Sequence, residues 1–238
     1  MTNIDTKGDT GRPGTKTPRR GRDPIPATVD WLLGFVTGTV GLVLTVAGLG
    51  MYTRVDRALI TEVVTAESTE INGLTTAEAV AAGGPFVDWF SAGLAVTGVG
   101  LIIAAVGFVR ARRRTRRRVA DEGGTTATFW ASTAYGVAVT ALVSFIPGAG
   151  IVGGGLAAHL WESGSGARVG AATGLVGWLL TAPLLAFLAV GLLTGASAAG
   201  VSGGGVVLVA IVVVGELVTL AVNVGAGALG GYVVGRFV

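Results

Sequence analysis

Long apolar runs separated by short polar segments dominate the chain from residue 29 onward. A run of roughly twenty apolar residues predicts a helix that crosses a bilayer, whose hydrocarbon core is about 30 Å thick. Two segments, 150–161 and 227–237, are shorter, and a helix of a dozen residues rises only about 18 Å. The long runs lie at residues 31–52, 86–109, 127–146, 169–193 and 206–224. The pattern therefore predicts an all-α polytopic transmembrane bundle of about five full-length spans plus two short Gly-rich helices, which either cross or re-enter the membrane.

The polar segments divide the chain into three predicted parts. Residues 1–26 hold almost no large apolar side chains, which predicts a disordered tail. Residues 27–118 are predicted to form a two-span helical hairpin whose spans are joined by the polar loop 53–85. Residues 119–238 are predicted to form a Gly-rich transmembrane bundle.

Two short surface helices are expected within the loop. Residues 55–65 place four apolar side chains on one helical face, those of Leu59, Ile60, Val63 and Val64. Thr75 with Glu78 fits a capping box. We expect the second of these helices to end at Gly83.

A dense basic run at residues 110–118 sets the expected orientation of the chain. Arginines beside an apolar span mark the cytoplasmic side, so residues 1–28 and 110–124 are predicted to be cytoplasmic. The acidic loop is predicted to be exported, and the chain to lie in the cell membrane. The run also offers a surface for anionic lipid headgroups or for protein docking. Its arginines are Arg110, Arg112, Arg113, Arg114, Arg116, Arg117 and Arg118.

Composition supports a membrane protein and excludes several other classes. Charged residues make up 13% of the chain, against about 25% in soluble domains, and the mean hydropathy is +0.71. The net charge of +3 resides mainly beside membrane segments, so we expect no binding to nucleic acid. Cysteine is absent, and the single His159 cannot form a zinc site alone. We expect no cofactor or metal.

A tripeptide occurs at the start of both spans of the hairpin, as Val29-Asp30-Trp31 and as Val87-Asp88-Trp89. Each copy is followed by a similar apolar stretch, from Gly41 to Gly48 and from Gly100 to Gly107. Two interpretations are open. The segments are related by duplication, or Asp and Trp mark two helix starts because a carboxylate suits the helix dipole and an indole suits the membrane interface.

Small residues spaced four apart form ladders in the C-terminal half. Residues 148–160 align without gaps on residues 225–237, which makes the two short helices a repeated element. A third ladder begins the span between them. Small faces of this kind let helix backbones touch within a bilayer, either inside the chain or between copies in a homo-oligomer. The ladder positions are Gly150, Gly154 and Ala158, then Gly166, Gly170 and Gly174, and finally Gly227, Gly231 and Gly235.

The same half of the chain, about residues 125–238, resembles small multi-pass membrane proteins of halophilic archaea whose function is unknown. The resemblance rests on Ile146-Pro-Gly, on Val152-Gly-Gly-Gly-Leu-Ala-Ala-His-Leu160, on the segment from Gly166 to Gly177, and on Gly225-Ala-Gly-Ala-Leu-Gly-Gly231. The family's usual Ala-Gly-Tyr-Leu is here Ala157-Ala158-His159-Leu160. The resemblance implies a helical membrane protein and no particular activity.

Glu216 lies near the middle of an apolar run, where an unpaired charge costs at least about 2.5 kcal/mol. Helical spacing places Thr219 and Asn223 on the same stripe, so we expect a polar strip that faces the bundle interior. Three roles are open for this carboxyl: a structural hydrogen bond, a proton or cation site, or a position at the interface.

The sequence contains no combination of nucleophile, base and orienting group, so we expect no enzymatic activity. The leading hypothesis is a structural or accessory membrane protein packed through small residues. The second is a proton- or cation-coupled transporter or channel that uses Glu216. The third is a membrane sensor or adaptor that senses through the exported loop and docks partners through the basic inner surface.

Overall fold

The computed structural model describes residues 25–66, 74–161 and 164–237, and all regular structure in these ranges is helical. The predicted tail lies outside the described residues, except for Ile25 and Pro26. The helices are α1 (Ala27–Arg54), α2 (Arg57–Ala66), α3 (Thr76–Glu122), α4 (Phe129–Leu142), α5 (Ala149–Leu160), α6 (Gly166–Ala198) and α7 (Ser202–Val234).

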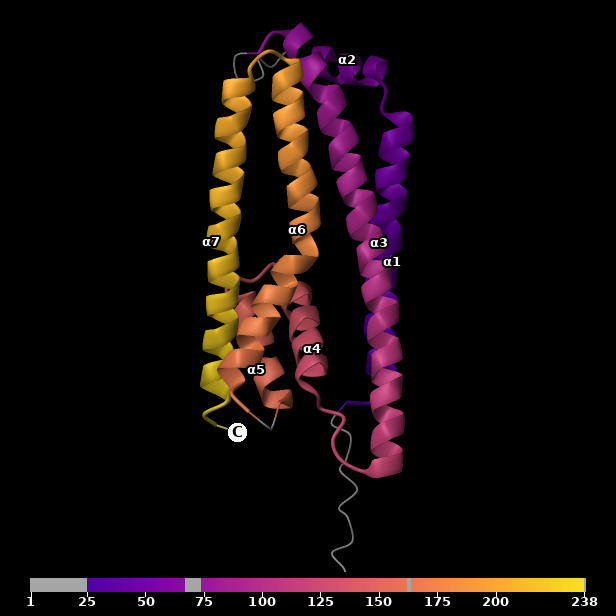
Figure 1. Ribbon diagram of the computed structural model, residues 1–238, viewed down its shortest axis with the longest axis vertical. Coiled ribbons are helices and arrows are strands. Elements are labelled where there is room, and N and C mark those ends of the chain that lie inside the picture. Colours follow the sequence, from indigo (N-terminus) through magenta and orange to yellow (C-terminus); the bar gives the residue numbers. More distant parts are fainter. Residues whose placement is uncertain (1–24, 67–73, 162–163, 238) are drawn as a thin grey trace, which may run out of the picture.

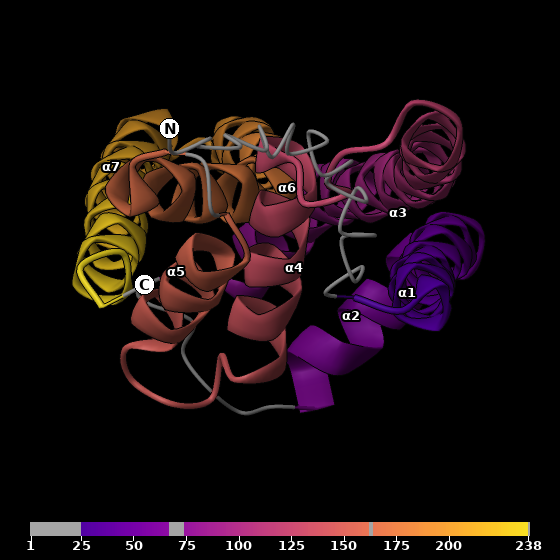
Figure 2. The ribbon, with the colours of Figure 1, turned by 90° about the horizontal axis from the view of Figure 1, so that it is seen from below.

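Within the described ranges, the four helices α1, α3, α6 and α7 are long and apolar enough to cross a membrane. They pack in the order α1, α3, α6, α7, so that each contacts the next. Seen along the bundle axis, they form an arc with α4 and α5 on its inner side (Figure 2). We call the end of the bundle that carries the arginines of α3 the basic end. The described C-terminus lies there too (Figure 1).

The predicted span 127–146 is instead half of a short helical pair. Helix α4 has 14 residues and α5 has 12, which correspond to about 21 and 18 Å. The chain rises from the basic end, turns back part of the way along the long helices and returns (Figure 1). Pro147 disfavours helical geometry at the residue before it, and Gly148 adopts a φ of 89°, which favours glycine. The described ranges therefore contain four long apolar helices where the sequence predicted five.

Helix α3 is a single helix of 47 residues, about 70 Å long. The predicted break at Gly83 is absent, although the capping box of Thr75 and Glu78 is present at its start. The helix continues through Pro85 because the segment before it is packed on both sides. Ala82 lies against Gly195 of α6, and Ile60 of α2 covers Gly83.

The second predicted short helix, 227–237, is the last part of α7 and continues from the predicted span 206–224 without interruption. No proline separates the two segments, and Gly227 lies in a helix contact rather than a turn. Of the two aligned segments, 148–160 forms a separate short helix, whereas 225–237 lies at the end of a long helix. They nevertheless pack against each other, since Gly154 meets Gly227 and Gly230 meets Ile151.

Helices α6 and α7 are antiparallel and touch along their glycines. A Cβ added at Gly170 or at Gly227 would overlap the backbone oxygen of the other residue. Gly166 and Gly231 form a second reciprocal pair, and Gly174 meets the carbonyl of Asn223. The contact residues are four apart on both helices and run in opposite directions along the two chains. The backbones therefore stay in contact over two turns. Ala158 and Gly235 border this contact near Gly166.

The hairpin of α1 and α3 uses glycines at a spacing of seven. Gly34, Gly41 and Gly48 are buried on α1, where they face α3. In the middle of this contact Gly41 meets Gly98, and an added Cβ at either residue would overlap the other's carbonyl oxygen. On α3 the residues that share this spacing are Ser91, Gly98, Ala105 and Arg112, all of them buried. Arg112 therefore continues the stripe of α3 that faces α1.

Candidate functional site

The most polar buried group of residues lies at the basic end, around Asp30 in the first turn of α1. Asp30 is 4% exposed. Arg112 donates from Nε to its Oδ1 at 3.1 Å, and Arg116 donates from Nε to its Oδ2 at 2.8 Å. The hydroxyl of Tyr135 on α4 donates to Oδ1 as well. We call these four residues the Asp30 network.

Both arginines reach further along the chain. Arg112, itself 4% exposed, donates from Nη1 to the carbonyl of Thr126 at 2.6 Å. Arg116 donates from Nη2 to the carbonyl of Ile25 at 2.8 Å. The Asp30 network therefore joins α1, α3 and α4 to the segments that precede α1 and α4. One carboxylate connects the N-terminal hairpin to the start of the short helical pair.

Helix geometry explains why these residues meet. Arg112 lies on the α1-facing stripe of α3, and Arg116 lies one turn further on the same side. Tyr135 is held by packing, because its ring makes an edge contact with Phe108 of α3 at 6.0 Å between centroids. The Arg112 guanidinium lies 5.7 Å from the Tyr135 ring centre. Asp30 also sits near the positive end of the α1 dipole, which favours a carboxylate.

A buried group of charges stabilises the fold only if each charge has its partners. Moving charges out of water is costly, and the cost is offset only where the partners and hydrogen bonds are present. Here the carboxylate accepts from two guanidinium groups and one hydroxyl, and the guanidinium groups use carbonyl oxygens as well. Removing one partner of a buried pair typically costs about 3–5 kcal/mol.

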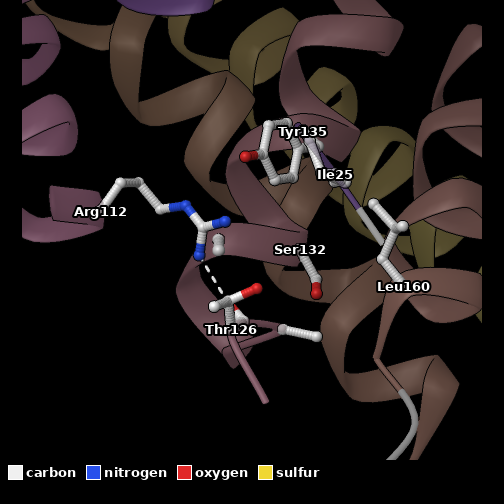
Figure 3. Close-up of a pocket in the computed structure, with 8 residues that line it drawn as sticks. Ile25, Arg112, Thr126, Ser132, Tyr135 and Leu160 are labelled. Atoms are coloured by element: carbon white, nitrogen blue, oxygen red, sulfur yellow. Dashed lines mark hydrogen bonds between the residues drawn. The ribbon is translucent and has the colours of Figure 1, made fainter. Parts of the chain in front are cut away.

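A small pocket adjoins the Asp30 network (Figure 3). It has a volume of about 10 Å³, roughly the space for one water molecule. Arg112, Ser132 and Tyr135 line it together with Leu160 of α5. The Ser132 hydroxyl oxygen is buried and has no hydrogen-bond partner within the described part of the chain. The pocket has a mainly apolar wall with a few polar groups and is too small for an organic substrate.

The arginine run divides between two faces of α3. Arg112 and Arg116 point inward to Asp30, while the other five are exposed. Arg113 lies over the ring of Trp31 at 4.4 Å from the centroid. At helical spacing, the remaining four form one exposed stripe on the side of α3 away from Asp30. We call Arg110, Arg114, Arg117 and Arg118 the arginine stripe.

The predicted polar strip around Glu216 is only partly assembled. Glu216 is half-buried and accepts a hydrogen bond from Nε1 of Trp178 on α6 at 3.1 Å. Thr219 is exposed, and its hydroxyl donates to the carbonyl of Gly215 on its own helix. Asn223 is half-buried, and its carbonyl lies against Gly174. The structure joins Glu216 to α6 through an indole, a partner that the sequence analysis did not identify.

The Asp30 network was not predicted from the sequence. Asp30 was open to two interpretations, a duplicated segment or a helix start, and the arginines were predicted to set topology or to bind lipid or protein. The seven-residue spacing of small residues on α1 and α3 was the available signal, because extending it along α3 reaches Arg112. Tyr135 had no comparable sequence signal. In the described residues, no group of three or more His, Asp or Glu side chains could hold a metal ion.

Comparisons with known proteins returned no match to a family model, a curated protein or a solved structure.

Proposed function

We propose that this chain is a structural or accessory protein of the cell membrane, in which a rigid helical bundle presents a basic surface at one end. The observation that carries the proposal is the Asp30 network, because it uses the most buried charges of the described residues to connect helices. The reciprocal glycine contacts of α6 and α7 support the same reading, since they fix backbones directly against each other.

The proposed orientation places the basic end in the cytoplasm, as expected for arginines beside membrane spans. The chain has no native cysteine, so single cysteines can report on each side. Cysteines introduced at the exposed Ala120 of α3 and at the exposed Thr65 of α2 are suitable positions. In intact cells an impermeant maleimide should label Thr65→Cys and not Ala120→Cys. The opposite pattern would reverse the proposed orientation.

The proposed partner of the arginine stripe is anionic lipid. Helix α3 carries this stripe beyond its apolar part, where guanidinium groups can reach phosphate oxygens. The test is to purify the protein from mixed membranes and to measure the anionic lipid that it retains. Replacing Arg110, Arg114, Arg117 and Arg118 by Gln should lower retention severalfold. Replacing the exposed Arg54, at the other end, should leave retention unchanged.

A proton- or cation-coupled transporter is the second candidate. Two features favour it. Glu216 lies in the apolar part of α7. The turn that joins α4 to α5 lies near the level of Asn223. Broken or short helices near the bilayer midplane form ion sites in many carriers. The hydrogen bond from Trp178 instead gives Glu216 a structural partner, which favours the first candidate.

Reconstituted vesicles separate the two candidates. A pH or sodium gradient is imposed across vesicles that contain the wild type or Glu216→Gln, and internal pH or sodium is followed. The amide keeps an acceptor oxygen for the Trp178 indole, so folding should be preserved in both proteins. We expect neither protein to increase flux over empty vesicles. Flux that requires Glu216 would reject the structural role and establish the transporter.

A further inference from the structure

Helix α2 differs from the other helices in its direction. It lies across the bundle axis at the end opposite the basic end (Figures 1 and 2). None of its residues is buried, and its contacts in the described structure are mainly with α3. A helix of ten residues with so little support from the rest of the chain is too short to be stable alone in water. A further stabilising surface is therefore needed.

The side chains of α2 separate into two exposed flanks. Ile60 and Val64 are half-buried, and Ile60 packs against Gly83 of α3. On one side of this contact lie Leu59 and Val63, which are 40% and 56% exposed. The other side is polar and carries Arg57, Thr61 and Thr65, all exposed. Because helical positions advance by about 100° each, the two flanks are distinct surfaces.

The chain holds α2 at the level where α1 ends. Only Val55 and Asp56 separate the two helices, so the first Cα of α2 lies within about 11 Å of the last Cα of α1. The Asp56 carboxylate accepts from the backbone N–H of Leu59 at 2.9 Å, which fixes the beginning of α2. Tyr52, in the last turn of α1, is 63% exposed, and Tyr is enriched at the boundary between lipid and water.

We propose that α2 is an interfacial helix whose Leu59 and Val63 flank inserts into the membrane surface. Its apolar flank faces the acyl chains, and its Arg57, Thr61 and Thr65 flank faces the headgroups and water. The occupant of the apolar flank is lipid. The alternative, a second copy of this chain, is an outcome of the test. The inference does not depend on the proposed function or on which end of the bundle is cytoplasmic.

Single cysteines labelled with the environment-sensitive dye NBD test the proposal in full-length protein reconstituted into phosphatidylcholine and phosphatidylglycerol vesicles. Val63→Cys reports the apolar flank, and Thr61→Cys reports the polar flank of the same helix. Val206→Cys, at a residue 60% exposed on α7, is the lipid reference, and Ala120→Cys is the water reference. Lipids that carry a nitroxide near the headgroup are added as quenchers.

The dye at residue 63 should emit at shorter wavelength than the dye at residue 61 and should be quenched at least twofold more by the shallow nitroxide. Water-like emission at both positions would overturn the proposal. Equal lipid-like emission would overturn the assignment of the two flanks. An efficient disulfide between two copies of Val63→Cys at high lipid-to-protein ratio would show that a second copy, not lipid, covers the flank.

Discussion

The two copies of Val-Asp-Trp have the same sequence but opposite surroundings. Asp30 is 4% exposed and belongs to the Asp30 network, whereas Asp88 is exposed. Trp31 carries Arg113 over its ring, whereas Trp89 packs against Phe187 of α6 at 5.8 Å between ring centroids. The difference arises from the rest of the chain: Asp30 meets two arginines that lie 82 and 86 positions away.

The stretches that follow the two tripeptides differ in the same way. Gly41 and Gly48 face α3 at backbone contact distance. Their counterparts Gly100 and Gly107 have no atom of another element within 4 Å of an added Cβ. Matched residues therefore do not occupy matched environments. The first copy lies at the start of α1, but the second lies in the interior of α3, so the expectation that both copies mark helix starts is wrong for the second. Long-range packing decides which copy becomes part of a site.

The largest expected effect is the replacement of the buried carboxylate. Asp30→Asn keeps the size of the side chain but leaves the buried Arg112 opposite a neutral amide. We expect the free energy of unfolding to fall by about 3–5 kcal/mol. The matched change Asp88→Asn should alter it by less than about 0.5 kcal/mol. Reversible denaturation in mixed micelles measures both, and equal effects would remove the distinction between the copies.

A smaller loss is expected when a side chain is added between α1 and α3. A Cβ at Gly41 would lie 2.6 Å from the carbonyl oxygen of Gly98, so Gly41→Leu must separate the helices. Overpacking of this kind costs about 3 kcal/mol at the upper end of its usual range. Gly100→Leu should be neutral or stabilising, because its position is open and leucine favours helix by roughly 1 kcal/mol over glycine. The same denaturation measurement should show a loss of stability for Gly41→Leu and none for Gly100→Leu. Two losses of similar size would refute the assigned contact face.

The loss of one hydrogen bond within the Asp30 network should cost less again. Tyr135→Phe keeps the ring that packs on Phe108 and removes only the hydroxyl that donates to Asp30. Hydrogen bonds to charged groups contribute about 1.5–3 kcal/mol, so we expect a loss of about 2 kcal/mol. Tyr52→Phe, at an exposed tyrosine near the other end, is the control. An unchanged melting temperature for Tyr135→Phe would place the hydroxyl outside the network.

The smallest effect concerns the first tryptophan. Arg113→Gln removes the cation over the exposed Trp31 ring, and such contacts contribute about 0.5–1 kcal/mol at exposed sites. Arg114→Gln, on the arginine stripe, changes the charge by the same amount and serves as the control. A shift in Trp31 fluorescence is expected for the Arg113 variant alone. Identical spectra of both variants would contradict the contact.

The sequence was sufficient to predict an all-helical protein with long apolar helices, because hydropathy and length suffice for that purpose. The capping box of Thr75 and Glu78 was also predicted, since it depends on local spacing. Whether a given proline ends a helix was not predictable from local sequence. Pro147 lies in the turn between α4 and α5, whereas Pro85 lies inside α3. The difference comes from the helices packed against the segment before Pro85.

The candidate sites show the same limit. The apolar run around Glu216 drew attention to that residue, but its partner Trp178 lies on another helix, 38 positions away. The sequence drew attention to Asp30 but did not predict a site around it, because its partners become neighbours only when α1, α3 and α4 assemble. Glycine ladders were visible as patterns. Their pairing, such as Gly170 with Gly227, required the antiparallel register of α6 and α7.

The central claim is that a buried ion pair joins α1 to α3 at the basic end, and a double-mutant cycle between Asp30→Asn and Arg112→Gln tests it most directly. The unfolding free energies of the wild type, both single variants and the double variant give the coupling between the two residues. We predict a coupling of at least about 1.5 kcal/mol, while the control cycle between Asp88→Asn and Arg112→Gln should give about zero, as distant pairs do. Additive effects of Asp30→Asn and Arg112→Gln would contradict the claim.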